Sequence, residues 1–174
     1  MERFWNIVHY FVYRGDCRLT LLFNYINPFR WILFIPVVRH FFYTKRGFDI
    51  VEEIEKAQKR PDIGLSSIIA GGVMNSLGFF ICLALVNLFY GFNRIAMNLR
   101  LYHFMIMVGV SLVANYFLLF KQDKYLAYFK EFEKMSQKDK RKWSRISLGV
   151  VIGIVLFLIG SFFILLKEKL GVRP

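Results

Sequence analysis

The side chains that first suggest a metal ion or a haem are three histidines together with Met97, Met105 and Met107. Copper(I) in particular favours thioether and imidazole ligands. The histidines are His9, His40 and His103, and no two of them stand three or four residues apart, the spacing that places two side chains on one helix face. The sequence therefore does not favour a metal or haem centre, and it predicts no cofactor.

Groups that could act as catalysts are equally scattered. The sequence contains no glycine-rich phosphate loop of the Walker or dinucleotide-binding type, and no serine, histidine and acid stand in a recognisable catalytic pattern. An enzyme that acts on lipid would need polar groups converging at headgroup depth, and the candidates are His9, Asp16, His40 and His103. Such an enzyme is the least favoured of three hypotheses for the function.

Three stretches of the chain contain no Asp, Glu, Lys or Arg, and they define the helices that must position these side chains. They are residues 63–93, 101–120 and 146–166. About 20 apolar residues in a helix span the roughly 30 Å hydrocarbon layer of a bilayer. The chain is 56% hydrophobic, above the ~45–50% apolar share of soluble domains. Residues 63–174 are therefore predicted to form an all-α integral membrane bundle, with transmembrane helices at about 64–92, 101–120 and 146–166.

Residues 1–43 are apolar overall but interrupted. The part from 19 to 43 contains Arg30 together with Pro28 and Pro36. A central Arg costs about 2.5–3.5 kcal/mol on insertion scales, and each proline removes a backbone donor. The pattern favours aromatic helices that are interfacial or re-entrant, and a fourth, imperfect span within 19–43 is the alternative.

Residues 44–62 are predicted to form a short water-exposed helix. Asp49, followed three residues later by Glu52, resembles a capping box. The clustered carboxylates of this segment fit a solvated helix face better than a cation site. The segment also carries two i,i+4 pairs in the favourable orientation, Glu52 with Lys56 and Glu55 with Lys59.

The chain carries 24 Lys and Arg against 12 Asp and Glu, a net charge of +12. Nine of the basic residues lie in 121–145, whereas only Arg94 and Arg100 lie between the first two apolar stretches. Because basic residues concentrate in cytoplasmic loops, we expect a multi-pass protein of the cell (inner) membrane with 121–145 as a cytoplasmic amphipathic helical hairpin. The position of the charges beside the apolar stretches accounts for them without a nucleic-acid partner.

A basic cluster lies directly before the third apolar stretch, where anionic lipid headgroups are expected. Each Lys or Arg near such a surface is worth about 1 kcal/mol. The residues predicted to face headgroups or a partner are Lys138, Lys140, Arg141, Lys142 and Arg145.

Small and polar residues give each apolar stretch one narrow face, along which helix backbones can approach closely in lipid. The predicted packing residues are Gly149, Gly153 and Gly160 in the third stretch, Ser67, Gly71 and Asn75 in the first, and Ser111 and Asn115 in the second. These faces can meet one another within one chain. Alternatively one of them, foremost the glycine face of the third stretch, docks against another subunit.

The leading hypothesis is a small non-catalytic integral membrane protein, a subunit or scaffold of a membrane assembly that associates with itself or with a protein partner. Its basis is that two charged amphipathic helices, within 48–60 and 121–145, are expected on the same side of the membrane. The alternative is a small homo-oligomeric pore or a membrane-permeabilising effector, since several copies can build a lumen that one copy cannot.

Overall fold

The computed structural model describes residues 1–26, 31–33, 35–47, 49–62, 64–93 and 99–169. All regular structure within these residues is helical, which confirms the all-α prediction. The elements are α1 (Glu2–Ile26), α3 (Pro36–Arg46), α4 (Ile50–Lys59), α5 (Leu65–Phe92), α6 (Leu101–Asn115), the π-helical η1 (Tyr116–Phe120), the 3₁₀ turn η2 (Lys121–Asp123), α7 (Lys124–Glu133) and α8 (Gln137–Lys169).

Three helical segments are long and apolar enough to cross a membrane, as predicted from the uncharged stretches. They are Leu65–Phe92, Leu101–Glu133 and Gln137–Leu166, of 28, 33 and 30 residues, and the second contains a break in its helical backbone at Gln122 and Asp123. The third is longer than expected, because the basic cluster before the apolar stretch forms the first turns of the same helix. We call these three segments the candidate spans.

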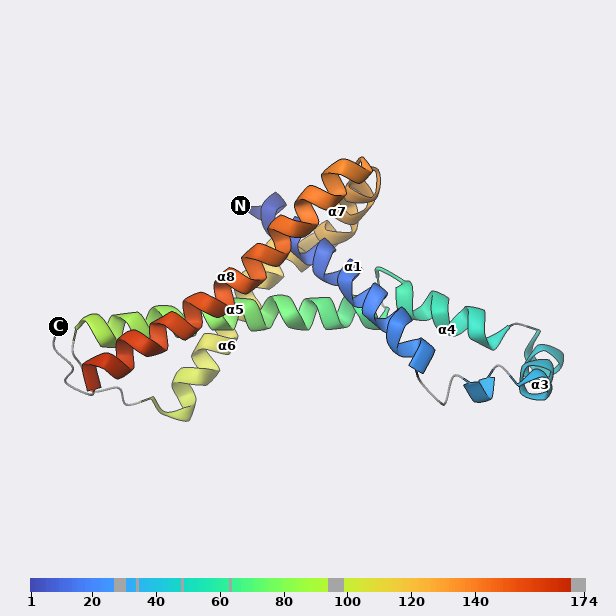
Figure 1. Cartoon of the computed structure of the whole chain (residues 1–174), viewed down its shortest axis with the longest axis horizontal. Helices are drawn as coiled ribbons and strands as arrows, with labels where there is room; N and C mark the ends of the chain where they lie inside the picture. Colours follow the sequence, from blue (N-terminus) through green and yellow to red (C-terminus); the bar gives the residue numbers. More distant parts are fainter. Residues whose placement is uncertain (27–30, 34, 48, 63, 94–98, 170–174) are drawn as a thin grey trace.

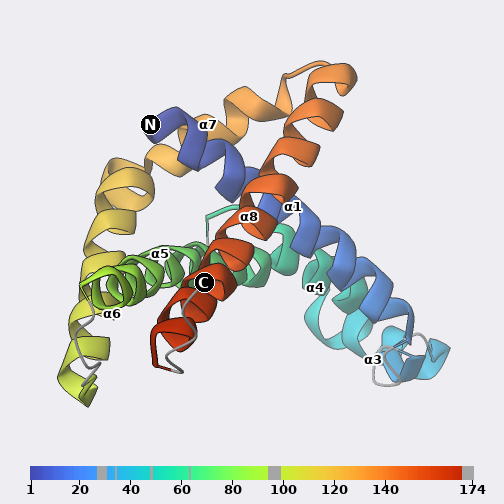
Figure 2. The same ribbon diagram turned by 60° about the vertical axis from the view of Figure 1, so that its left-hand side comes forward.

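The central element is α5, which contacts α1, α4, α6 and α8. Figure 1 shows α8 crossing α5 at an open angle, and Figure 2 shows α6 and α8 on different sides of α5. Only 11% of the most apolar part of α8 is buried inside the chain. The candidate spans therefore leave much apolar surface uncovered by the rest of the molecule.

The amino-terminal helix differs from the short interfacial helix expected from the sequence. α1 runs without a break for 25 residues and packs against α5, α7, α8 and η1. Its residues Ile7 and Val8 are buried in the protein rather than turned to lipid. The apolar spacing correctly predicts one helix face. It does not show whether that face meets lipid or protein, because both require the same spacing. The alternative of a fourth span within 19–43 falls partly on residues outside the described set.

The short helix α4 begins where the sequence indicated. The Asp49 carboxylate accepts a hydrogen bond from the backbone N–H of Val51 at 3.1 Å, so that Asp49 caps the helix. Both expected i,i+4 pairs are present, Lys56 with Glu52 at 2.8 Å and Lys59 with Glu55 at 3.3 Å. The carboxylates thus form ion pairs on an exposed face.

The end of the second candidate span contains an irregularity that its sequence does not indicate. After Asn115 the helix widens into the π-helical turn η1, and Gln122 and Asp123 then adopt left-handed backbone angles with φ of 60° and 53°. This conformation costs non-glycine residues about 1–2 kcal/mol each. The turn redirects the chain so that α7 lies against α1.

Candidate functional site

A buried polar junction joins α1, α5 and α6. The Asn115 side-chain amide donates hydrogen bonds to the carbonyl oxygens of Met74, at 3.2 Å, and Ser111, at 3.0 Å. Its Oδ1 accepts a hydrogen bond from the indole N–H of Trp5 at 2.7 Å. A buried amide costs free energy unless it is paired, and Asn115 is paired on both sides. Asn115 therefore fixes three helices relative to one another.

The helices α5 and α6 pack tightly against each other at Gly78, a position that the local sequence does not mark. A Cβ at this position would lie 2.4 Å from the hydroxyl oxygen of Ser111. That hydroxyl donates to the carbonyl of Asn75 at 2.7 Å. Gly78 belongs to no GxxxG pattern, so only the crossing itself reveals its role.

A second polar contact ties α5 to α8. The side-chain amide of Asn87 donates a hydrogen bond to the hydroxyl of Ser161 at 3.1 Å, and both side chains are buried. A polar side chain in a membrane-spanning helix can line a polar path or bond a neighbouring helix. Asn87 and Asn115 both bond a neighbouring helix.

The packing residues predicted from the sequence divide into two groups. Ser67 and Gly71 of α5 are buried, Ser67 donating to the Pro61 carbonyl at 2.8 Å and Gly71 lying against the ring of Phe120. Asn75, the third residue of that face, is half-buried, and its backbone carbonyl is the Ser111 acceptor. The glycines of α8 are different, because a Cβ at Gly149, Gly153 or Gly160 would meet nothing within 4 Å. The α8 glycine face therefore contacts no described part of the chain.

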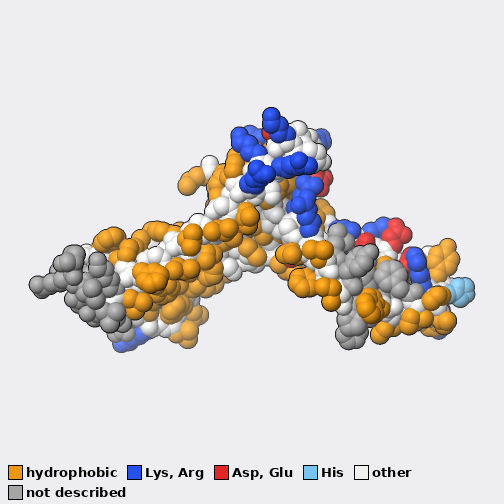
Figure 3. All heavy atoms as spheres, in the orientation of Figure 1, with side chains coloured by type: hydrophobic (Ala, Val, Ile, Leu, Met, Phe, Trp, Pro, Cys, Tyr) orange, Lys and Arg blue, Asp and Glu red, His pale blue; other side chains and the backbone are white. Residues whose placement is uncertain are grey.

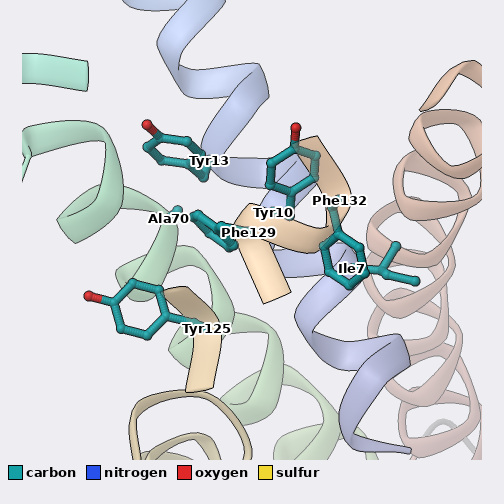
Figure 4. Close-up of a cluster of buried hydrophobic side chains, with 7 residues drawn as sticks. All are labelled: Ile7, Tyr10, Tyr13, Ala70, Tyr125, Phe129 and Phe132. Atoms are coloured by element: carbon teal, nitrogen blue, oxygen red, sulfur yellow. The ribbon is translucent and has the colours of Figure 1, made fainter. Parts of the chain in front are cut away.

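An aromatic cluster fills the space between α1, α5 and α7. Figure 4 shows its members, which are Ile7, Tyr10, Tyr13, Ala70, Tyr125, Phe129 and Phe132. The ring of Tyr10 lies edge-on to those of Phe129 and Phe132, with centroids 5.2 and 5.6 Å apart. Aromatic pairs in this geometry add about 0.5–1.5 kcal/mol each beyond their buried area. The cluster anchors α7 on α1.

His9 is fully buried against this cluster, and neither of its ring nitrogens has a hydrogen-bond partner among the described residues. The rings of Phe129, Tyr125 and Phe120 lie 5.1, 5.7 and 6.0 Å from it, centroid to centroid. Burial lowers the pKa of His9 from 6.5 to about 4. His9 is therefore neutral at physiological pH and acts as a packing group.

Burial also acts on the two neighbouring tyrosines of α1. It raises the pKa of the Tyr10 hydroxyl, and it raises that of Tyr13, to which nearby Cys17 contributes in the same direction. The Tyr13 hydroxyl donates to the backbone carbonyl of Lys59 at 2.5 Å, tying α1 to the end of α4. The Tyr13 hydroxyl is therefore a neutral donor rather than a base.

The four residues named for an interfacial enzyme are not brought together. His40 lies on α3, His103 lies on α6, and these helices stand well apart in Figures 1 and 2. His103 accepts a hydrogen bond from the backbone N–H of Arg100 at 3.1 Å, and Asp16 accepts one from Thr20 at 3.5 Å. Within the described ranges no group of three His, Cys, Asp or Glu side chains is placed to hold a metal ion.

The basic cluster predicted before the third span lies on the first turns of α8. Lys138, Arg141, Lys142 and Arg145 are exposed there, and Lys140 is half-buried. Figure 3 shows Lys and Arg side chains gathered on the surface over α7 and the first turns of α8, while hydrophobic side chains cover the arm formed by α5 and the rest of α8. Charge and apolar surface are thus segregated along the molecule.

The comparisons with known proteins give no family for this chain: it matches no family model, no curated protein and no solved structure.

Proposed function

We propose that this protein is a non-catalytic, membrane-spanning subunit or scaffold that associates with itself through the α8 glycine face, defined by Gly149, Gly153 and Gly160. The proposal depends on one observation, that these glycines recur along one face of α8 and that a Cβ at each would meet no described atom within 4 Å. Helices in lipid gain little from apolar contact and associate where small residues let their backbones approach. The side-chain N–H groups of Asn87 and Asn115, by contrast, already donate hydrogen bonds within the chain.

The orientation follows from the distribution of charge. In the proposed topology α5, α6 and α8 cross the inner membrane, and the basic connection 121–145 lies in the cytoplasm. The charged surfaces of α4 and α7 are then on the same side, available to a partner, and anionic headgroups surround the first turns of α8.

The test is the oligomeric state of the purified full chain in mild detergent and in lipid nanodiscs, measured as molecular mass. We expect a dimer or a larger assembly, and we expect Gly149→Leu with Gly153→Leu to weaken association at least about tenfold, because two bulky side chains separate the backbones. The matched control is Gly72→Leu with Gly109→Leu, which places the same side chains at positions of α5 and α6 where a Cβ also meets nothing within 4 Å. A wild-type chain that is monomeric in both media, or a control pair with the same effect, would overturn the proposal.

The second candidate, a homo-oligomeric pore, requires the same assembly and in addition a conducting path. Ion conductance of the reconstituted wild-type protein separates it from a scaffold, since only a pore passes current.

A further inference from the structure

A pocket of about 380 Å³ lies between α1 and the first turns of α8. Its wall carries five basic side chains drawn from two helices that are far apart in sequence, Arg14, Arg18, Lys140, Arg141 and Arg145. The sequence alone indicates only the α8 members, because nothing in it shows that α1 lies beside α8. We call this hollow the basic pocket.

The basic side chains of the pocket are not balanced by acidic side chains in its described lining. In the described part of the chain none of its four arginines forms an ion pair. Lys140 donates a hydrogen bond to the backbone carbonyl of Glu133 at 2.6 Å, and two acids of α7 and α1 are paired with other cations, Glu131 with Arg3 at 2.6 Å and Glu2 with Lys124 at 2.9 Å. Cations held close together repel one another, so a bound anion would relieve the repulsion.

The chemistry of the lining narrows the class of anion. Guanidinium groups match the geometry of phosphate oxygens and bind them through paired hydrogen bonds. Ser144 adds a hydroxyl and Gln137 an amide, while Phe11 adds an apolar wall. The pocket therefore offers charge, neutral donors and one hydrophobic contact, which is the composition expected of a site for a phosphate group attached to a larger molecule.

We propose that the basic pocket binds the phosphate group of an anionic ligand, and that the source of this phosphate is the headgroup of an anionic phospholipid. The assignment to a phospholipid headgroup rests on the proposed topology and on the position of the pocket. Arg145 immediately precedes the uncharged stretch of α8 that begins at Ile146. In a helix that crosses a bilayer, this is the depth of the headgroups. A soluble phosphate compound shares the chemistry and is distinguished by experiment.

The test measures binding to the full-length protein in neutral detergent by calorimetry. Three probes are used, the water-soluble dioctanoyl phosphatidylglycerol, dioctanoyl phosphatidylcholine and inorganic phosphate. We expect saturable binding of phosphatidylglycerol at one site per chain, and at least about tenfold weaker binding of the other two. Inorganic phosphate binding as tightly as phosphatidylglycerol would support the pocket but assign it to a soluble phosphate compound. Absence of saturable binding for every probe would overturn the proposal.

Variants separate the pocket from the general positive charge of the surface. Arg18→Gln with Arg141→Gln removes two charges from the lining, and we expect affinity for phosphatidylglycerol to fall about tenfold or more. Lys138→Gln with Lys142→Gln removes the same charge from exposed positions of α8 outside the lining, and we expect little change. An equal loss in both pairs would show that only surface charge matters, and would overturn the proposal.

One substitution closes the pocket without altering its charge. Gly15 lines the pocket, and a Cβ there meets nothing within 4 Å, so Gly15→Leu fills space while leaving all five basic side chains in place. Leucine is also the better helix former, so we expect the variant to fold. We expect it to lose binding as strongly as the charge variant, and binding at wild-type affinity would contradict the proposed location.

Discussion

The indole N–H of Trp5 donates a hydrogen bond to Oδ1 of Asn115 at 2.7 Å. This contact joins the first turns of α1 to the last residue of α6 across 110 residues of sequence. Because Asn115 also bonds Met74 of α5, the contact fixes the position of α1 relative to both α5 and α6. The stability of the whole arrangement should therefore respond to small changes at this contact.

Trp5→Phe removes the donor but keeps an aromatic ring. It leaves the buried Oδ1 of Asn115 without its partner, and we expect the free energy of unfolding to fall by about 1–2 kcal/mol. Circular dichroism in detergent during denaturant unfolding measures the change. Trp143→Phe is the control, since the Trp143 ring contacts Phe4 edge-on with centroids 6.5 Å apart, a contact that phenylalanine can retain. Equal losses in the two variants would argue against the hydrogen bond.

Gly78→Ala tests the crossing of α5 and α6. The added Cβ would lie 2.4 Å from the Ser111 hydroxyl, which must give up its bond to the Asn75 carbonyl or push the helices apart. We expect a loss of about 1–3 kcal/mol in the free energy of unfolding.

The control for this position is Gly72→Ala on the same helix, where a Cβ meets nothing within 4 Å. Its expected effect is neutral or a gain of up to about 1 kcal/mol from helix propensity. Adding Ser111→Gly to Gly78→Ala should recover part of the loss. The prediction fails if Gly78→Ala proves as stable as Gly72→Ala.

His9 predicts a pH dependence of stability. Its pKa is about 4 in the folded chain and 6.5 as the ordinary value, so between these limits the unfolded chain binds the extra proton. The contribution of neutral His9 to the free energy of unfolding is therefore fully present above pH 6.5. It decreases as the pH is lowered toward 4, by about 3 kcal/mol in all. Unfolding measured across this range should show the slope. His9→Leu should abolish it while leaving the stability at pH 7.5 intact, and a wild-type slope in the variant would assign the effect to other groups.

The turn after η1 predicts opposite effects of glycine at adjacent positions. Gln122 has φ of 60°, a region that glycine occupies without steric cost, so Gln122→Gly should raise the melting temperature. Lys121 has φ of −57°, so Lys121→Gly should lower it, because glycine only adds freedom to the unfolded chain. Thermal unfolding of the two variants, each expected to differ from wild type by about 0.5–1 kcal/mol, decides the matter. Destabilisation by both would show that the left-handed turn is not strained.

The structural features that could be predicted from the sequence are those indicated by residues close together in the chain. Absence of charge over about 20 residues is sufficient to indicate a helix of membrane-spanning length, and Asp49 followed by Glu52 marks a helix start within one residue. The surroundings of α1 could not be read in this way. Ile7 and Val8 form an apolar face at helical spacing, but only the folded chain shows that this face meets α5 and α7 rather than lipid.

The candidate sites were harder to predict from the sequence for the same reason. Gly78 is distinguished from the other glycines only by the Ser111 hydroxyl opposite it. Arg14 and Arg18 become part of a pocket only because α1 lies against α8. Gln122 adopts a left-handed backbone although it is neither glycine nor asparagine, the residues that usually mark such a conformation in a sequence.

One helix of 33 residues carries both Arg141 and Gly153, with no proline along its described length. Such a rod is about 50 Å long, and it has no joint that could absorb a rotation at one end. A ligand bound in the basic pocket would therefore set the tilt of the far end, and in the proposed assembly it would also set the angle at which a second copy meets the α8 glycine face. Lipid composition and assembly geometry would then be mechanically linked in this molecule.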